Sequence, residues 1–516
     1  MRRRLVSAAK AAFPAHTMRG RLLRSMLPRS AGWRLSAAYK RYIRDVEPWA
    51  WRAQIRETPP ADDPLFSVVI PMFNTPDAYL HPLLDSLTNQ VFDGFEAILA
   101  DASTQPERAA AIERAASADP RLHYLRLHTN DGISANTNAA IDAARAPYIV
   151  FADHDDTLNP HALNEVAHGL AADQAIDIVY SDEDVLSDDG LTRKNPFFKP
   201  AWSPHMFLEC NYTNHMSVVR RSLISEVGGL RPEMDGAQDY DLLLRLHTLG
   251  RPLKVRHIPA MLYHWREAVT STARTIDTKS YAVDAGRKAV AEYMQRVGVA
   301  SDGVDDVPGH PGWYRVRPRW DVKVAVVSTD SAPAYVDVLR HATKATTCKP
   351  VWISQPDGFD AAQLPDDIEA LVVVRQRYVP DDPTWLDDLV GALALPGATA
   401  VAPLLVGPSG RVDSAGFVRD GVGMCNLLVG CKAEAGDICG PTHMLRDVDA
   451  LSACVVAVKR GDVDLVTADD TMIFVPQHRG HAVLWAHQAM TRRDELRASG
   501  YLNPHVGLGP MGWLAR

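Results

Sequence analysis

The chain of 516 residues lacks any run of about 18 or more consecutive apolar residues, which argues against a membrane-spanning helix. It has only six cysteines, with neither a CxxC pair nor a histidine-containing zinc spacing, so we expect reduced thiols in a cytoplasmic protein. Its Arg-rich start is not followed by a continuous apolar segment, and we therefore expect no secretory signal. What remains is the composition of a globular protein, 46% hydrophobic and 23% charged, long enough for two domains.

Acidic residues are absent from residues 1–44, whereas twelve Arg or Lys side chains occur there. The apolar residues between these cations would let a basic helix lie on anionic lipid, although Pro14 and Pro28 interrupt any single helix. We therefore expect residues 1–56 to be either an arm in peripheral contact with the inner membrane or a solvated basic arm. No basic, aromatic-rich recognition module accompanies this arm, so we expect no nucleic-acid partner.

A Pro-rich polar stretch at residues 57–65 predicts the start of a first domain. Strand-like and helix-like segments then alternate, which predicts an α/β domain with a doubly wound parallel sheet. The expected strands are residues 66–71, 95–100, 122–127, 148–152 and 176–180, and the expected helices are residues 80–89, 107–118 and 134–144. A second α/β stretch begins near Val322, after a connection at residues 308–320 that contains Pro, Gly and Trp.

The apolar run Tyr148–Phe151 leads directly into the carboxylates Asp153, Asp155 and Asp156. Open α/β sheets bind ligands at the carboxyl ends of their strands, so these acids are expected at a site. Clustered carboxylates repel one another unless a cation holds them, and a divalent ion bridging to a nucleotide diphosphate is the usual solution. The alternative is a helix cap at Asp156 or Thr157, which would explain one acid but not three.

Six motifs occur in one order across residues 66–275, and together they resemble the inverting family-two glycosyltransferases. They are residues 67–74 (SVVIPMFN), 98–101 (ILAD), 130–138 (NDGISANTN), 153–156 (DHDD), 238–245 (QDYDLLLR) and 264–266 (HWR). The last of them is typical of the O-antigen and rhamnan subgroup, whose members carry tandem transferase domains. The resemblance implies a GT-A fold, a nucleotide-sugar donor, Mn²⁺ or Mg²⁺, and transfer with inversion at residues 57–310.

The resemblance also implies a role for each matching residue. Asp239 would be the base that deprotonates the acceptor, and its alternative is a helix N-terminal acid stabilised by the helix dipole. Asp155, Asp156 and His264 would bind the metal. Asp101 would accept from a uracil or thymine N3–H, which suits UDP or dTDP better than GDP. The implied donor-binding residues are Pro71, Phe73, Asn74, Asp101, Gly132, Asn138, Asp153 and Arg266, and the implied acceptor or sugar contacts are Asp182, Glu183, Asp184 and Gln238.

Two of these positions depart from the family pattern, because Phe73 stands for the commoner Tyr and Gln238 for Glu. For the other residues, simpler interpretations stay open. His264 could be a structural histidine, Arg266 a surface cation, and residues 182–184 a solvated acidic turn.

Residues 320–516 resemble a second transferase domain whose DxD motif is lost. The strand expected at residues 371–374 leads into Arg375, Gln376 and Arg377, and two cations with an amide do not coordinate Mg²⁺ or Mn²⁺. An acid pair survives at Asp469 and Asp470. We therefore expect a degenerate GT-A-like domain without metal-dependent catalysis.

The sequence thus predicts a metal-dependent glycosyltransferase that moves a sugar from UDP or dTDP to a glycan or lipid-linked glycan such as an O-antigen. One alternative is a non-catalytic carbohydrate-binding scaffold derived from a transferase. A nucleotidyltransferase would need a Gly-rich basic loop after the first strand, and residues 71–76 do not form one.

Overall fold

The computed structural model divides the chain into two compact units. The N-terminal unit comprises residues 18–202 and 211–293, and the C-terminal unit contains residues 203–210 together with 294–516. The structure describes residues 39–48, 63–267, 280–308, 310–329, 335–343, 347–354, 364–375, 377–420, 423–433, 436–437, 440–441, 445–466, 472–475 and 480–493. The predictions for most of the basic arm, for Gln376, and for Asp469 and Asp470 lie outside the described residues.

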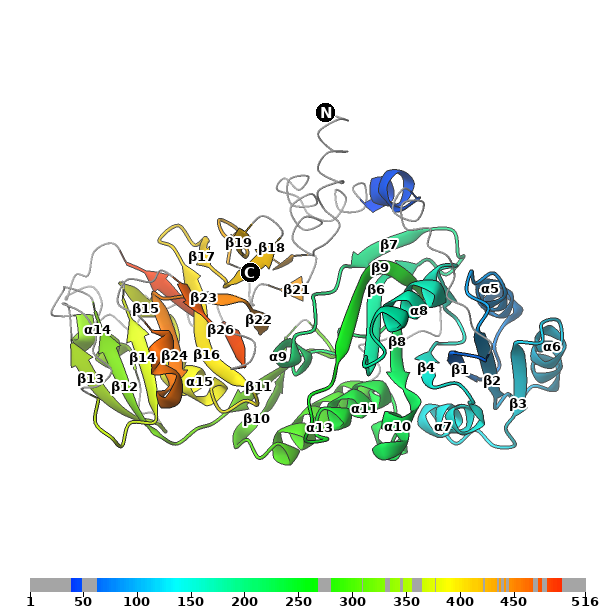
Figure 1. Cartoon of the computed structure of the whole chain (residues 1–516), viewed down its shortest axis with the longest axis horizontal. Helices are drawn as coiled ribbons and strands as arrows, with labels where there is room; N and C mark the ends of the chain where they lie inside the picture. Colours follow the sequence, from blue (N-terminus) through cyan, green and yellow to red (C-terminus); the bar gives the residue numbers. More distant parts are fainter. Residues whose placement is uncertain are drawn as a thin grey trace. The chain divides into compact units, whose positions relative to one another are not determined.

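The N-terminal unit is built on a sheet whose strands follow the order β3-β2-β1-β4-β8-β6-β9-β5, with β7 beside β6 (Figure 1). The strands are β1 (Phe66–Met72), β2 (Phe95–Asp101), β3 (Leu122–Arg126), β4 (Tyr148–Phe151), β5 (Thr157–Leu158), β6 (Ile178–Leu186), β7 (Arg193–Phe197), β8 (Ser217–Arg220) and β9 (Val255–Arg266). The helices are α5 (Asp77–Thr88), α6 (Pro106–Ala116), α7 (Ile133–Ala143), α8 (Ala162–Ala172), α9 (Pro204–Phe207, in the C-terminal unit), α10 (Arg221–Glu226), α11 (Gln238–Leu246) and α13 (Ser280–Arg296).

Apolar strands at the centre of this sheet are covered on both faces, and this explains why they read as continuous hydrophobic runs. Side chains of α5, α6 and α8 share one core cluster with alternate residues of β1 and β2, while α7 lies on the opposite side (Figure 1). The buried polar groups within the strands are paired. Ser67 donates to Glu96 (2.7 Å), which also accepts from Arg145 (2.8 Å). The predicted α/β class is therefore confirmed.

The prediction of a wholly parallel sheet is wrong for the half of the sheet beyond β4. Strands β3, β2, β1 and β4 are parallel, but β8 is antiparallel to both β4 and β6. Strand β8 has only four residues, Ser217–Arg220, and such a short run carries no periodic signal that separates it from a loop. Its insertion makes the sheet mixed and brings the segment before it, residues 211–216, to the end of β4.

The C-terminal unit repeats the strand path of the N-terminal sheet, and its described residues include no counterpart of β3. Its order is β13-β12-β14-β24-β16-β26-β15, with β17 beside β16. Each neighbouring pair runs in the same relative direction as its counterpart in the order β2-β1-β4-β8-β6-β9-β5. The elements are β12 (Lys323–Ser328), β13 (Lys349–Ser354), β14 (Ala370–Val374), β15 (Tyr378–Pro380), β16 (Ala398–Val406), β17 (Val412–Ser414), β24 (Val455–Lys459), β26 (His481–Arg492), α14 (Tyr335–Ala342) and α15 (Trp385–Ala392).

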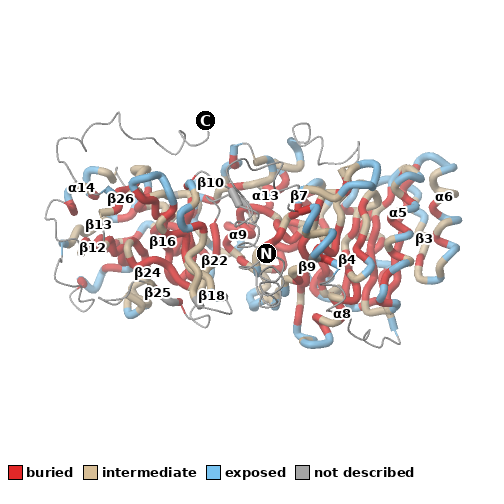
Figure 2. The backbone as a smooth tube through the Cα atoms, turned by 90° about the horizontal axis from the view of Figure 1, so that it is seen from above, coloured by how far each residue is buried: buried red, intermediate tan, exposed pale blue. Residues whose placement is uncertain are grey.

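Each unit has its own apolar core, and the central strands of both are buried (Figure 2). Smaller strands complete the C-terminal unit, among them the hairpin β10 (Ser301–Asp306) and β11 (Tyr314–Pro318), and β22 (Arg446–Val448), which pairs with β26. Among the described residues, no helix combines the length and the hydropathy that a membrane crossing requires.

Candidate active site

The loop after β4 carries the acid cluster, and its innermost member, Asp156, is fully buried and held on both oxygens. The Tyr263 hydroxyl donates to Oδ2 and the Arg266 backbone N–H donates to Oδ1, each at 2.6 Å. Burial, together with the charges of Asp155 and Asp153, raises the Asp156 pKa well above its ordinary value. Asp156 therefore fixes the loop against β9. Each of its oxygens already accepts one hydrogen bond, so only the lone pairs not used in these bonds can bind a cation.

Replacing Asp156 with Ala is expected to destabilise the N-terminal unit by about 2–4 kcal/mol, because the buried Tyr263 hydroxyl and Arg266 N–H would lose their acceptors. Asp156→Asn keeps a carbonyl acceptor and should cost less. Asp153→Asn serves as the control, since the Asp153 side chain is 41% exposed. Urea unfolding of the three variants tests this prediction, and equal midpoints would contradict the structural role of Asp156.

Three side chains from different elements meet beside this loop: Asp153, Glu183 on β6 and His215 before β8. His215 Nε2 lies 3.6 Å from Asp153 Oδ2, and His215 Nδ1 lies 3.2 Å from Glu183 Oε2. The His215 ring stacks on Tyr263 at 4.9 Å between ring centroids. Burial opposes the charge on His215, but Glu183, Asp153 and Asp156 outweigh it and raise the His215 pKa to about 9. A protonated His215 thus supplies part of the positive charge that this acidic group needs.

Two further carboxylates, Asp155 and Asp239, border the same group. Within the described residues, Asp155 makes no salt bridge and no side-chain hydrogen bond, and burial raises its pKa, with His154 acting in the opposite direction. Asp239 is the second residue of α11; burial raises its pKa, while the charge of His215 lowers it. Asn211 Nδ2 donates to Asp239 Oδ2 at 3.3 Å. The Tyr240 backbone N–H donates to Asp239 Oδ1 at 2.9 Å. A carboxylate with a raised pKa, oriented by these two donors, has the chemistry of a general base.

The residues best arranged for a cation are Asp153, Asp156 and His215, whose ligand atoms lie within 4.8 Å of one another. Carboxylate oxygens and an imidazole nitrogen suit Mn²⁺, and oxygens alone suit Mg²⁺. Asp155, which is adjacent and makes no salt bridge among the described residues, can add a further oxygen. The residues present therefore fit a divalent cation.

His264, which the resemblance implied as a ligand, has another partner. Its Nδ1 lies 2.7 Å from Asp184 Oδ1, and Asp184 is also bonded by Arg193 (2.6 Å) and by the Tyr39 hydroxyl. Asp182 and Asp184 share one side of β6 because side chains alternate along a strand. Asp182 accepts from the Lys199 N–H (2.9 Å) and lies 2.7 Å from His257 Nε2. Of the three predicted acids on β6, only Glu183 reaches the group around His215.

Arg266, predicted to contact phosphate, is buried and bonded to the acid loop. Its Nε donates to the Asp155 carbonyl (2.6 Å) and its Nη1 to the Asp188 carbonyl (3.2 Å). The surface-cation interpretation is therefore wrong for Arg266, because the side chain is only 1% exposed.

The predicted base contact, Asp101, is buried and already accepts three hydrogen bonds. Its donors are the Ser103 N–H (2.9 Å), the Tyr124 hydroxyl (2.9 Å) and Arg126 Nη1 (3.2 Å). Asn74 has a positive φ of 48° and joins the two turns after β1 and β2, accepting from the backbone of Thr104 and Gln105. Asp101 would reach a nucleobase only by exchanging one of its present donors.

Of the remaining predicted residues, Pro71 and Phe73 lie at the end of β1, and the other three contact loop residues. Phe73 is exposed and Pro71 half-buried. Gly132 begins α7 with a φ of 95°, and a Cβ there would meet the Asp235 carboxylate. Asn138 exchanges two hydrogen bonds with the Leu230 backbone (2.8 and 2.9 Å). Gln238 accepts from the Gly236 N–H and closes the turn that begins α11.

Sequence reasoning missed His215 and Asn211. Both occur in the polar segment 211–216, immediately before the short apolar strand β8. The available signal was a polar segment followed by a Val-Val pair. Only the antiparallel pairing of β8 with β4 brings this segment to the acids, and the sequence does not show that pairing.

The corresponding positions in the C-terminal unit carry different groups. Arg375 follows β14 as Ala152 follows β4, and its N–H donates to the Cys454 carbonyl (2.7 Å). Asp413 accepts from the Tyr378 hydroxyl (2.9 Å) and lies 3.3 Å from Arg492 Nη1. The metal-type group of the C-terminal unit, among its described residues, lies elsewhere and is described below.

Acids and a histidine gather after the central strand of a mixed α/β sheet. Sheets of this class bind ligands at the carboxyl ends of their strands, so the arrangement is that of a ligand-binding domain. Residues 67–228 match the family described as Glycosyl transferase family 2. The chain therefore contains a Glycosyl transferase family 2 domain, and the prediction that this domain belongs to family two is confirmed.

Two relatives extend the similarity beyond that domain. The chain is 30% identical to the uncharacterized protein y4gI of Sinorhizobium fredii over 447 residues, which cover 78% of this chain and 49% of that protein. It is 32% identical to the O-antigen biosynthesis protein RfbC of Myxococcus xanthus over 393 residues, covering 69% and 30%. The chain thus spans about half of the first relative and under a third of the second.

Among solved structures, the chain is similar to TarS residues 1–349 of S. aureus, with 19% identity, a TM-score of 0.33, and coverage of 45% of this chain and 71% of that one. It is also similar to the mannosyltransferase PcManGT of Pyrobaculum calidifontis, solved with GDP-Man and Mn²⁺, with 18% identity, a TM-score of 0.35, and coverage of 50% and 75%.

Proposed function

We propose that the N-terminal unit is a metal-dependent, inverting glycosyltransferase that moves a sugar from a UDP- or dTDP-linked donor to a growing cell-surface glycan. The observation that carries the proposal is the convergence of Asp153, Asp155, His215 and Asp239 within a Glycosyl transferase family 2 domain. The relative named for O-antigen biosynthesis supports a polysaccharide or lipid-linked glycan as acceptor.

Asp239 is the proposed base. In-line transfer with inversion needs one group that removes the acceptor hydroxyl proton while the bond to the donor diphosphate breaks on the opposite face of the sugar. Burial raises the Asp239 pKa and Asn211 holds one of its oxygens, so the carboxylate is oriented and basic enough to accept that proton.

Asp153, Asp155, Asp156 and His215 are the proposed cation ligands, and a bound Mn²⁺ or Mg²⁺ would supply charge stabilisation to the departing diphosphate. His215 would give up its proton when the ion binds, because only the neutral imidazole is a ligand. Glu183 orients His215 through its contact with Nδ1, leaving Nε2 facing Asp153. This ligand set differs from the one the resemblance implied, because His215 takes the place that His264 was expected to fill.

The C-terminal unit is proposed to be a transferase-derived domain without metal-dependent catalysis at the end of β14. Its strand path, which repeats that of the N-terminal sheet, supports this origin. The cations Arg375 and Arg377 stand at the position of the acid loop, and this supports the loss of metal-dependent catalysis. We further propose a cytoplasmic protein, with residues 1–56 in peripheral contact with the inner membrane.

The proposed function is tested by incubating the full chain with Mn²⁺, a glycan acceptor and UDP- or dTDP-sugars, one donor at a time. We expect release of nucleoside diphosphate that depends on the acceptor, and a product whose anomeric configuration, measured by proton NMR, is opposite to that of the donor. Glycan binding without diphosphate release from any donor would favour the non-catalytic scaffold instead.

A further inference from the structure

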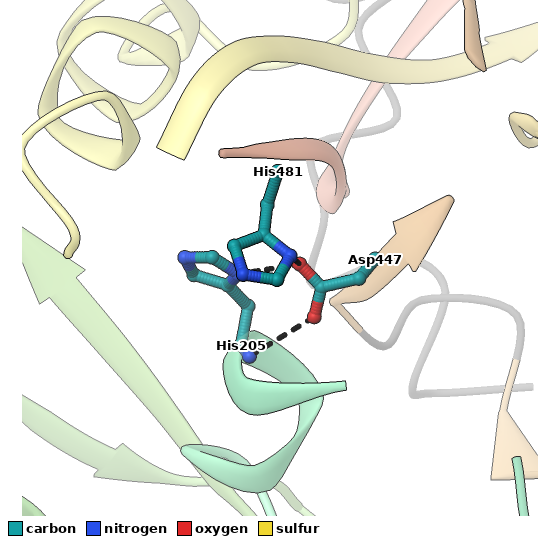
Figure 3. Close-up of side chains that lie close together, drawn as sticks. All are labelled: His205, Asp447 and His481. Atoms are coloured by element: carbon teal, nitrogen blue, oxygen red, sulfur yellow. Dashed lines mark hydrogen bonds and ion pairs between the residues drawn. The ribbon is translucent and has the colours of Figure 1, made fainter. Parts of the chain in front are cut away.

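The C-terminal unit contains a second group of metal-type side chains, His205, Asp447 and His481, which the proposed transfer reaction does not use (Figure 3). Their ligand atoms lie within 4.8 Å of one another. His205 Nδ1 is 2.6 Å from Asp447 Oδ1, and His481 Nδ1 is 3.3 Å from the same oxygen. All three residues belong to one compact unit, although His205 is more than 240 positions from the other two in the chain.

The fold fixes each of these side chains from a different element. His205 lies on the short helix α9, which Ser203 begins by accepting from the Met206 N–H (3.3 Å). Asp447 lies on β22, and His481 is the first residue of β26, which pairs with β22 so that Asp447 faces Val483. The Asp447 carboxylate also accepts from the Ser203 hydroxyl (2.6 Å) and the His205 backbone N–H (3.2 Å), and these two donors set its orientation.

The spacing is close to that of a tetrahedral zinc site. With Zn–N and Zn–O bonds of about 2.0–2.1 Å, neighbouring ligand atoms in a tetrahedron lie about 3.3 Å apart. The His481–Asp447 separation already has this value. The His205–Asp447 pair is closer by about 0.7 Å, a hydrogen-bond distance, and a cation would take the place of the hydrogen between the two atoms.

We propose that His205, Asp447 and His481 form a Zn²⁺ site that fastens residues 203–210 to the C-terminal sheet. Two imidazoles and one carboxylate are a donor set that zinc favours, with a water completing the tetrahedron. The carboxylate is held by Ser203, which is the second layer of support that a metal ligand needs. The site shares no residue with the group around His215, so the zinc proposal does not depend on the transfer reaction.

A simpler account is a hydrogen-bonded clamp between His205 and Asp447 without any metal. The two accounts differ over His481, whose ring lies edge-on to that of His205 at 5.3 Å between centroids and is 41% exposed. The clamp does not need His481, whereas the metal site does. Because His481 is partly exposed, replacing it leaves the clamp and the surrounding core in place.

The test is titration of the chelator-treated full chain with Zn²⁺ by calorimetry, and with Co²⁺ followed by visible absorption, which reports tetrahedral coordination. The parent protein carries Asp153→Asn and Asp155→Asn, so that the group around His215 competes less. His481→Gln removes one proposed ligand. The matched control is His487→Gln, since His487 is another buried, acid-paired histidine of the same unit, bonded to Glu209.

We expect one equivalent of Zn²⁺ to bind the parent, His481→Gln to bind it at least about 100-fold more weakly, and His487→Gln to match the parent. Intense visible bands of bound Co²⁺ should disappear with His481→Gln. The proposal is overturned if the parent binds no Zn²⁺, or if His481→Gln binds it as tightly as the control, and either result would leave the hydrogen-bonded clamp. Circular dichroism of each variant confirms that a weaker binder is folded.

Discussion

Replacing Asp239 with Asn is expected to lower kcat by about 10²- to 10⁴-fold while leaving the affinity for donor nucleotide within about threefold. The amide keeps the size of the side chain and the contact with Asn211, but it cannot accept the acceptor's proton. Because burial raises the Asp239 pKa, the rate should rise with pH as this carboxyl loses its proton, and the acid limb of the kcat/KM profile should lie above the usual range of an aspartate.

The measurement is diphosphate release over a range of pH for the wild-type chain and for Asp239→Asn. Asp284→Asn on α13 is the control, since the Asp284 side chain is 63% exposed and pairs only with Arg287 among the contacts described. A variant Asp239→Asn that keeps at least a tenth of the wild-type rate would exclude Asp239 as the base and favour the helix-terminal interpretation of this acid.

Replacing Asp153 with Asn is expected to weaken Mn²⁺-dependent nucleotide binding by about 100-fold or more without a comparable loss of stability. Asp153 faces His215 Nε2 and is the most exposed acid whose contacts in this group are known, so it loses a ligand charge but little packing. Asp155→Asn should act in the same direction, because its carboxylate has no salt bridge among the described residues.

Calorimetric titration of each variant with nucleotide in the presence of Mn²⁺ checks this expectation. Asp142→Asn is the control, since Asp142 is an exposed acid on α7 outside the group. If Asp153→Asn and Asp155→Asn both bind nucleotide with wild-type affinity, the two carboxylates do not bind a cation and only stabilise the loop after β4.

The strands and helices of the N-terminal unit were largely predictable, because buried apolar runs and amphipathic helices leave strong periodic signals. Strands β1, β2 and β4 begin at the predicted residues, 66, 95 and 148. The four-residue strand β8 left no such signal, and the sequence therefore predicted parallel strands where the sheet is mixed. The long strand β26 was equally hidden, since residues 481–492 mix apolar side chains with two histidines and Arg492.

The acids of the site were predictable from their position after β4, but their partners were not. Asp155 and Asp156 are adjacent in sequence, yet Asp156 is held by Tyr263 and Arg266, whereas Asp155 has no such donors among the described residues. The choice between His264 and His215 depends on which histidine the pairing of β8 with β4, and of β9 with β5, brings toward the loop. Asp184 holds His264 through Nδ1, and His264 is not among the three residues whose ligand atoms come together after β4. The contact with Asp184 is a tertiary one that no local pattern records.

The central claim, that the acid loop of the N-terminal unit binds a nucleotide diphosphate with a cation, is tested most directly by calorimetry of UDP, dTDP and GDP with the full chain. Each nucleotide is titrated with and without Mn²⁺. We predict tight binding of UDP or dTDP that requires Mn²⁺ and is abolished in Asp155→Asn. Absence of binding for all three nucleotides under both conditions would contradict the claim and leave a glycan-binding scaffold as the better account.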